Sequence, residues 1–151
     1  MRHWLLIGWL AKHTDTLFLE RGSRRAAQRA SEQMAEHLRA GKRIVVFPEG
    51  TTSNGDNVSP FHGALFQAGI DAAEIISPLA IRYTNAKGER SYAAAFIGEM
   101  TLLECFWSIA CADGITATIT ALPILHADTG DRRHLSAHAH HTISHYLNHP
   151  R

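Results

Sequence analysis

The feature that most constrains the fold is a short apolar run that ends abruptly in a proline and a glycine. Residues 43–47, Arg-Ile-Val-Val-Phe, have the β-branched, apolar composition of a buried strand. Pro48 has no N–H to donate to a sheet ladder, so the strand is predicted to end there. Glu49 and Gly50 then lie at the carboxyl end of a core strand, where α/β sheets open their ligand-binding crevice.

The segments before this run predict a strand followed by a crossover helix. Residues 16–19 have a strand pattern, and a helix is predicted from Arg24 to Ala40 with Gly41 placed to stop it. The helix rests on apolar residues at helical spacing: Ala27, Ala30, Met34 and Leu38. A helix between two strands of one sheet predicts that residues 16–19 and 43–47 run parallel.

Strand and helix patterns continue to alternate downstream. They predict a helix of about three turns from Pro60, a strand over 75–81 disturbed by Pro78, a strand over 92–97, a helix over 101–112, a half-exposed strand over 115–124 and a last helix over 132–148. The predicted fold class is α/β, a mostly parallel sheet flanked by helices, in a single domain over residues 1–151.

Net charge, cysteine spacing and the length of the apolar runs limit the possible partners and the cellular compartment of the protein. A formal net charge of +1 gives no case for nucleic acid as a partner. Cys105 and Cys111 are six positions apart, which suits neither a disulfide nor a metal pair and favours a reducing compartment. No apolar run approaches the ~20 residues needed to cross a bilayer. Trp4 and Trp9 pack in a core or lie at a membrane interface, and the sequence leaves both open.

The residues after the apolar run have the chemistry of a binding site. Thr51, Thr52 and Ser53 add hydroxyls and backbone N–H groups beside the Glu49 carboxylate, and Gly50 permits a sharp turn or a close approach to a ligand. The alternative is an ordinary polar turn between a strand and a loop.

Four blocks in order resemble the lysophospholipid acyltransferases, the family of 1-acyl-sn-glycerol-3-phosphate acyltransferase. They are Leu-Phe-Leu-Glu-Arg at 17–21, Phe-Pro-Glu-Gly-Thr at 47–51, Pro-Phe-His-Gly-Ala-Leu-Phe at 60–66 and Ile-Ser-Pro-Leu-Ala-Ile at 76–81. The resemblance implies transfer of an acyl group from acyl-CoA or acyl-carrier protein to a lysolipid hydroxyl. It implies a peripheral protein at the cytoplasmic face of the cell membrane, with no metal or prosthetic group.

The resemblance also assigns roles to individual residues. Arg21 and the Glu49-Gly50-Thr51 turn are expected to bind the polar head of the acceptor, with Thr52 and His62 as further candidates for substrate binding. Because a carboxylate repels phosphate, Glu49 is expected to orient Arg21 or an acceptor hydroxyl. Arg21 as part of an ion pair and Glu49 as a loop former are the structural alternatives.

The family's first block, His-x-x-x-x-Asp, supplies the catalytic base and is missing ahead of Arg21. His13-Thr14-Asp15 does not replace it, because Asp15 follows His13 by two positions, whereas the block places its aspartate five positions after the histidine. We therefore expect the base upstream of Met1, the chain to lack the N-terminal part of the domain, and this polypeptide to be inactive. Thr52 replaces the arginine usual after Glu-Gly-Thr, which makes a lyso-ornithine lipid acceptor plausible beside 1-acyl-glycerol-3-phosphate.

Two other functions compete with this reading. One is a non-catalytic protein of the same fold that binds lipid or acyl carrier, which the absent His-Asp block favours. The other is a metal-binding module formed by a histidine stripe at His134, His138, His141 and His145, spaced for one face of the last helix. An exposed amphipathic helix with no functional metal explains the stripe equally simply.

Overall fold

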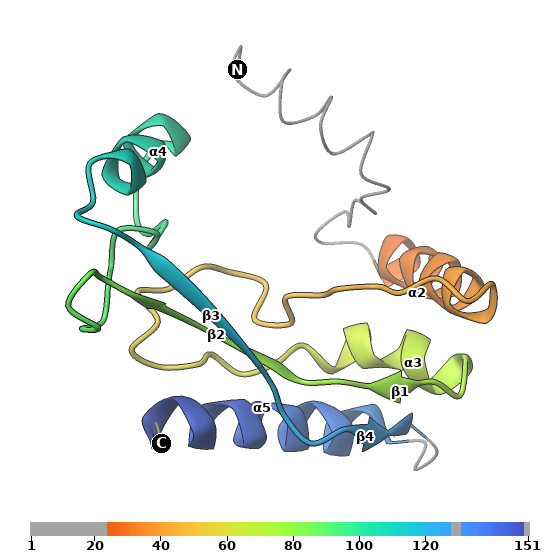
Figure 1. The fold of residues 1–151 in the computed structure, drawn as a ribbon. Coiled ribbons are helices and arrows are strands. Elements are labelled where there is room, and N and C mark those ends of the chain that lie inside the picture. Colours follow the sequence, from red (N-terminus) through yellow and green to blue (C-terminus); the bar gives the residue numbers. More distant parts are fainter. Residues whose placement is uncertain (1–23, 128–130, 150–151) are drawn as a thin grey trace.

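The computed structural model describes residues 24–127 and 131–149, and all structural statements below concern those residues. Helices and short strands alternate along the chain (Figure 1). The elements are α2 (Arg24–Arg39), the 3₁₀ helix η1 (Gly63–Phe66), α3 (Gln67–Asp71), β1 (Ile75–Ile76), β2 (Leu79–Thr84), α4 (Leu102–Ala110), β3 (Thr116–Ala121), β4 (Leu125–His126) and α5 (Arg132–Asn148). The mixed α/β class is confirmed.

The strands of the described part form two antiparallel pairs, β1 with β4 and β2 with β3. The β2–β3 ladder is in register from Leu79 opposite Ala121 to Thr84 opposite Thr116. The expectation of a mostly parallel sheet therefore fails for the strands described here. The first strand of the predicted parallel pair, residues 16–19, lies outside the described residues, so that pairing stays a prediction.

The prediction that residues 43–47 form a buried strand is wrong. The segment is extended, but it pairs with no strand among the residues described. Val45 and Phe47 are each 73% exposed, and only Ile44 packs against a core cluster. An apolar run indicates a strand only where a ladder partner lies alongside it, and none of the described strands does.

The helix predicted from Arg24 to Ala40 is confirmed as α2. The helix ends one residue before Ala40, and Gly41 follows in a left-handed conformation with φ of +76°. The N–H groups of Gly41 and Lys42 donate to the carbonyls of Leu38 and His37, at 2.8 and 3.0 Å. This is the Schellman arrangement, in which a glycine satisfies the last carbonyls of a helix.

Two predicted elements differ from the structure. The helix expected from Pro60 begins only at Gly63 and is split into η1 and α3. Residues 92–97 form no strand; the Ala95 N–H donates to the Tyr92 carbonyl, which turns the chain, and the only nearby pairing is a bridge between Thr84 and Arg90. Pro78 separates β1 from β2, as the predicted disturbance at that position implied.

The core consists of two clusters on either side of η1 and α3. One joins η1 to α5 and β4 through Phe66, Leu125, Ala127, Leu135 and Ala139. The other joins α2 to α3 through Met34, Ala35 and Ala68. In Figure 1, η1 and α3 accordingly lie between α2 and α5.

The β2–β3 ladder packs against α5 on one face. Tyr146 OH lies 2.9 Å from the Thr120 hydroxyl, and Arg82 donates to the Leu147 carbonyl at 3.0 Å. The side chains that alternate with these are exposed; they include Ile81 and Ile119. No helix in the described part is long and apolar enough to cross a membrane.

Candidate functional site

The Phe47–Gly50 segment folds as a tight turn fastened to the start of η1. The Gly50 N–H donates to the Phe47 carbonyl at 3.2 Å, and Gly50 has φ of +66°. The His62 N–H donates to the Pro48 carbonyl at 2.9 Å. Pro48 therefore uses its carbonyl to hold together two segments that are separated by an eleven-residue loop, residues 51–61.

The Glu49 carboxylate forms a hydrogen bond that joins the two ends of that loop. Its Oε2 accepts a hydrogen bond of 2.8 Å from the Ser59 N–H, and the Glu49 side chain is partly buried. A carboxylate held by a backbone donor has a defined direction, which an oriented contact to a substrate requires. The alternative in which Glu49 shapes the loop thus has a direct structural basis, and the two roles are compatible.

The His62 imidazole lies directly over Gly50. A Cβ atom added to Gly50 would lie 2.9 Å from Cδ2 and 3.0 Å from Nε2 of His62. The absence of a side chain at Gly50 is therefore what allows the ring to approach the turn. The structure brings Glu49, Gly50 and His62 together, while Arg21 lies outside the described residues.

The threonines after the turn differ in their surroundings. The Thr52 hydroxyl donates to the Phe96 carbonyl, so this side chain joins the turn to a segment far along the chain. Thr51 is exposed, and among the described residues its hydroxyl contacts only the neighbouring Thr52 carbonyl, at 3.5 Å. Thr51 is thus the more available of the two for a ligand. The binding roles of all these residues stay predictions.

A polar cluster that the sequence did not predict forms around Asp56, in the loop that follows the turn. Asp56 forms an ion pair with Arg90 at 3.0 Å and accepts a hydrogen bond from the Tyr92 hydroxyl at 3.1 Å. The Arg90 guanidinium also lies over the Tyr92 ring, 5.7 Å from its centre. These partners are more than thirty residues apart in sequence, and no local pattern indicates such a contact.

His140 was not predicted as a site residue, and it lies on the same helix as the histidine stripe but is not part of it. Its Nε2 lies 2.9 Å from the Val58 carbonyl, and its ring meets the edge of Phe61 with 5.3 Å between ring centres. His140 faces inward and ties the loop to α5. No local sequence pattern indicates this contact, since Val58 and His140 are 82 residues apart in the chain.

Sequence reasoning overlooked one occurrence of the His-x-x-x-x-Asp spacing, at His126 and Asp131. It follows the Phe-Pro-Glu-Gly-Thr block instead of preceding it. His126 is exposed on β4 opposite Ile75, and the Asp131 carboxylate accepts a hydrogen bond of 2.8 Å from the Arg133 N–H as the N-cap of α5. Asp131 has a structural role here, and nothing in this arrangement orients the His126 ring toward the turn.

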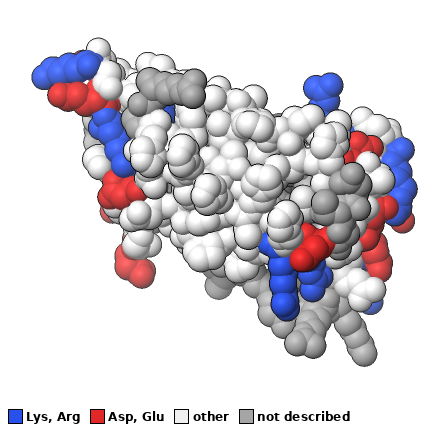
Figure 2. Space-filling model, turned by 90° about the horizontal axis from the view of Figure 1, so that it is seen from below, with Lys and Arg blue, Asp and Glu red and all other residues white. Residues whose placement is uncertain are grey.

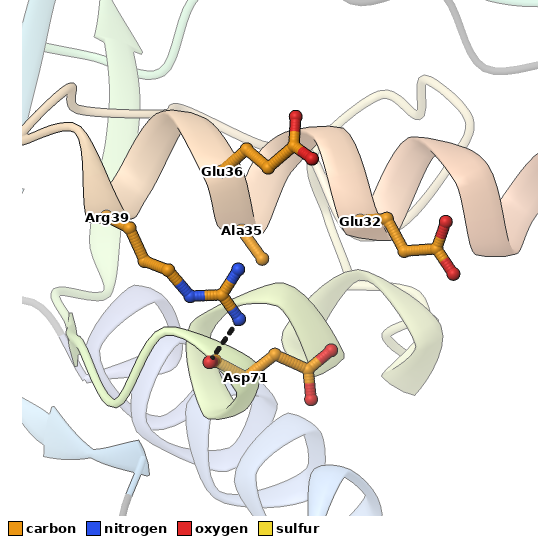
Figure 3. Close-up of a pocket in the computed structure, with 5 residues that line it drawn as sticks. All are labelled: Glu32, Ala35, Glu36, Arg39 and Asp71. Atoms are coloured by element: carbon orange, nitrogen blue, oxygen red, sulfur yellow. Dashed lines mark hydrogen bonds between the residues drawn. The ribbon is translucent and has the colours of Figure 1, made fainter.

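A separate hollow lies between α2 and α3 (Figure 3). It is lined by Glu32, Ala35, Glu36, Arg39 and Asp71, and Arg39 donates to the Asp71 carbonyl oxygen at 2.7 Å. Three carboxylates against one guanidinium give the lining a net negative charge. Because acyl-CoA and phosphate head groups are anionic, this hollow does not suit them.

The outer side of α5 carries the predicted histidine stripe. Figure 2 shows the molecule from this side, and charged side chains gather toward the edges of the view. Neighbouring rings are spaced by 6.1 Å between the centres of His134 and His138, and by 6.2 Å between those of His141 and His145. In the described parts of the chain, no group of three or more histidine, cysteine or acidic side chains is placed to hold a metal ion.

Comparison with known proteins places these features in a family. Residues 1–82, more than half of the chain, match the Acyltransferase family. The chain belongs to this family, which confirms the resemblance drawn from the four blocks. The match ends before His126, so the His126–Asp131 spacing lies outside it.

Two relatives are named as acyltransferases. The chain is 40% identical over 103 residues to a lyso-ornithine lipid O-acyltransferase of Pseudomonas aeruginosa, covering 68% of this chain and 39% of that protein. It is 28% identical over 134 residues to the 1-acyl-sn-glycerol-3-phosphate acyltransferase of Neisseria meningitidis, covering 89% and 52% respectively. The chain thus spans about half or less of these relatives. No solved structure shows detectable similarity to it.

Proposed function

We propose that the chain is the acceptor-binding part of an acyltransferase that esterifies a lysolipid with an acyl group from acyl-CoA or acyl-carrier protein. The acceptor hydroxyl oxygen attacks the thioester carbonyl carbon, the C–O ester bond forms and the C–S bond breaks. A base takes the hydroxyl proton, and the thiol leaves with a proton. In this proposal Glu49, Gly50, Thr51 and His62 hold the acceptor, and Arg21 contributes from the preceding block.

The observation that carries the proposal is the convergence of the family's own block with a second segment. The His62 ring lies over the Gly50 backbone, the Pro48 carbonyl accepts from the His62 N–H, and the Glu49 carboxylate accepts from the Ser59 N–H, so three contacts join the turn to residues 59–62. The hydrogen-bonded Glu49 carboxylate and the backbone of the turn are preorganised, which lowers the entropic cost of positioning a reactant. Membership of the Acyltransferase family supplies the reaction class.

Lyso-ornithine lipid is our preferred acceptor, and 1-acyl-glycerol-3-phosphate is the alternative. Similarity to the lyso-ornithine enzyme of Pseudomonas aeruginosa is higher than to the Neisseria enzyme, although it covers less of this chain. Thr52 supports the same choice, because the arginine usual at this position would bring a cation to a phosphate. Glu49 does not distinguish the two acceptors, since it belongs to the block shared with the 1-acyl-glycerol-3-phosphate enzymes. Thr52, bonded to the Phe96 carbonyl, offers no cation for phosphate.

We further propose that these 151 residues bind the acceptor without transferring the acyl group to it. Support comes from the order of the motifs: the one His-x-x-x-x-Asp spacing follows the turn, and its aspartate caps α5. The protein would act peripherally at the cytoplasmic face of the cell membrane. A binding protein of the same fold that never catalyses transfer is the competing function, and the same experiment separates the two.

The experiment measures acceptor binding and acyl transfer by the purified chain. We expect lyso-ornithine lipid to bind more tightly than 1-acyl-glycerol-3-phosphate, and Glu49→Gln to weaken the binding of both. Glu36→Gln, which alters a carboxylate beside the hollow of Figure 3, is the matched control and leaves both unchanged.

Adding acyl-CoA or acyl-carrier protein then tests catalysis. We expect no ester product from the chain alone, and product from a longer native form that carries the base. Transfer by the chain alone would overturn its proposed inactivity. A longer native form that binds the acceptor but makes no ester would favour the binding function. Equal binding of both acceptors would remove the acceptor assignment, and binding unaffected by Glu49→Gln would remove Glu49 from the site.

A further inference from the structure

Helix α4 is apolar on both of its sides. Leu102, Cys105 and Ile109 face the protein and are buried or partly buried. The opposite side exposes Leu103 at 77%, Phe106 at 62% and Trp107 at 72%. Only Glu104 and Ser108 interrupt the apolar circumference of α4, and helices that are mostly apolar normally lie inside a protein core or in a membrane. In Figure 1, α4 instead stands at one end of the molecule, away from α2 and α3.

Local contacts make this short exposed helix well defined. The Thr101 hydroxyl accepts from the Glu104 N–H, and the Glu104 carboxylate accepts from the Thr101 N–H at 2.6 Å, which forms a capping box. These hydrogen bonds lower the pKa of Glu104, so its carboxylate is ionised at neutral pH. The charge lies at the start of the helix and marks the polar border of the apolar surface.

The composition around α4 indicates which kind of surface it contacts. Residues 91–112 contain no lysine or arginine and only two acidic residues, Glu99 and Glu104. Phe and Trp beside Leu, on a helix lying flat, are typical of the boundary between lipid head groups and acyl chains. The absence of cations implies that such contact depends on apolar insertion and not on attraction to anionic lipid.

The segment that leads into α4 is also tied directly to the candidate site. The Phe96 carbonyl accepts the Thr52 hydroxyl, and Arg90 and Tyr92 both contact Asp56. Residues 90–96, which lead into α4 and are called its stem below, are therefore joined by side-chain contacts to the loop that follows the turn. A surface that holds α4 therefore lies near the segment that contacts the loop after the turn.

We propose that α4 docks the protein on a lipid bilayer, with Leu103, Phe106 and Trp107 inserted at the interface. Docking presents the Glu49–Thr51 turn to the membrane surface, from which a lysolipid acceptor is taken. This purpose rests on the proposed function, whereas the docking itself rests on α4 alone. The bilayer replaces water around three large side chains, which provides the driving force.

The test is flotation of the purified full chain with phosphatidylcholine vesicles, without any acyl donor. We expect Phe106→Ser/Trp107→Ser to reduce the partition coefficient by at least about tenfold, since two aromatic side chains lose their insertion. Phe106→Leu/Trp107→Leu should largely restore binding. Ile119→Ser is the matched control, because Ile119 is as exposed as Phe106, at 62%, but lies on β3; it should leave binding unchanged.

Two further readouts give the mode of contact. Adding phosphatidylglycerol to the vesicles should not strengthen α4-dependent binding. In a Trp4→Phe/Trp9→Phe background, Trp107 emission should shift to shorter wavelength with vesicles and be quenched by lipids brominated on their acyl chains. Circular dichroism and melting of each variant establish that it folds.

Several results would overturn the proposal. They are failure of the parent chain to float, equal loss of binding in Ile119→Ser, or unchanged binding in the double serine variant. Failure to float, together with a dimer that the serine variant converts to monomer, would show that a second copy covers α4. Since flotation requires no acyl transfer, failure of the proposed function leaves this test intact, and the reverse also holds.

Discussion

Replacing Gly50 with alanine separates the two demands that the structure makes at this position. Gly50 has φ of +66°, and Gly41 has φ of +76°, so alanine at either adopts a left-handed conformation that costs about 1 kcal/mol. An added Cβ at Gly41 meets no atom within 4 Å, whereas at Gly50 it meets the His62 ring at 2.9 Å. Gly41→Ala is therefore a control for backbone strain without the contact.

The geometry gives different expectations for stability and for the site. Carbon atoms pack best at about 3.5–4 Å, so the His62 ring must move away by roughly 0.5–1 Å in Gly50→Ala. His62 is exposed, and its ring can rotate at little cost. We expect both variants to lose about 1 kcal/mol, a fall in Tm of roughly 2–4 °C. Only Gly50→Ala should displace His62 and weaken acceptor binding.

Chemical denaturation measures the first expectation, and the NMR signals of the His62 imidazole measure the second. When His62→Ala has removed the ring, Gly50→Ala should cost the same ~1 kcal/mol as in the parent chain, so the double-mutant cycle should give a coupling energy near zero. Unchanged stability in both glycine variants would refute the strain argument. Identical His62 signals in Gly50→Ala and the parent chain would refute the close approach. A loss several kcal/mol larger at Gly50 would mean that the ring is fixed in place.

Three further predictions concern the contacts that hold the site. Glu49→Ala leaves the Ser59 N–H without its acceptor and should cost about 1 kcal/mol in denaturation, whereas Glu49→Gln retains an acceptor and should cost less. His140→Phe keeps a ring against the loop but loses the hydrogen bond to the Val58 carbonyl, so we expect a loss of about 1 kcal/mol and faster amide exchange across residues 51–61. Hydrogen bonds from the first turn of α5 lower the pKa of Asp131 below its ordinary value of 3.8. The stability that the Asp131 carboxylate contributes to the folded chain is therefore fully present above pH 3.8 and is lost as pH falls through the lower folded pKa. Melting curves of Asp131→Asn at different pH values should lack this acid-dependent loss.

The helices were predictable because their signals are local. In α2, α4 and α5 the residues that define the element lie within four positions of one another, and Gly41, Thr101 and Asp131 terminate or cap them through nearby backbone groups. The 132–148 prediction for α5 agrees with the structure at both ends. The strand pattern of residues 43–47 was equally clear, yet it failed because strand formation depends on a partner elsewhere in the chain.

In the candidate site, too, the local part was predictable from the sequence and the long-range contacts were not. The Phe-Pro-Glu-Gly-Thr block marks the turn, and sequence alone associated it with the Acyltransferase family. The partners that hold the turn were not predictable, since Asp56 meets Arg90 and Val58 meets His140 across 34 and 82 residues. Many arrangements of the chain are compatible with one hydrophobic pattern, and only packing selects which distant groups meet.

By itself, the sequence determined the family, the main helices and the position of the polar turn, because each depends on residues that are neighbours in the chain. Tertiary structure alone decided that the described strands pair antiparallel, that the His62 ring lies over Gly50 and that Thr52 joins the stem of α4. It also decided that Phe106 and Trp107 face outward while Cys105 faces inward. A helical pattern apolar on both sides does not specify which side the rest of the protein covers.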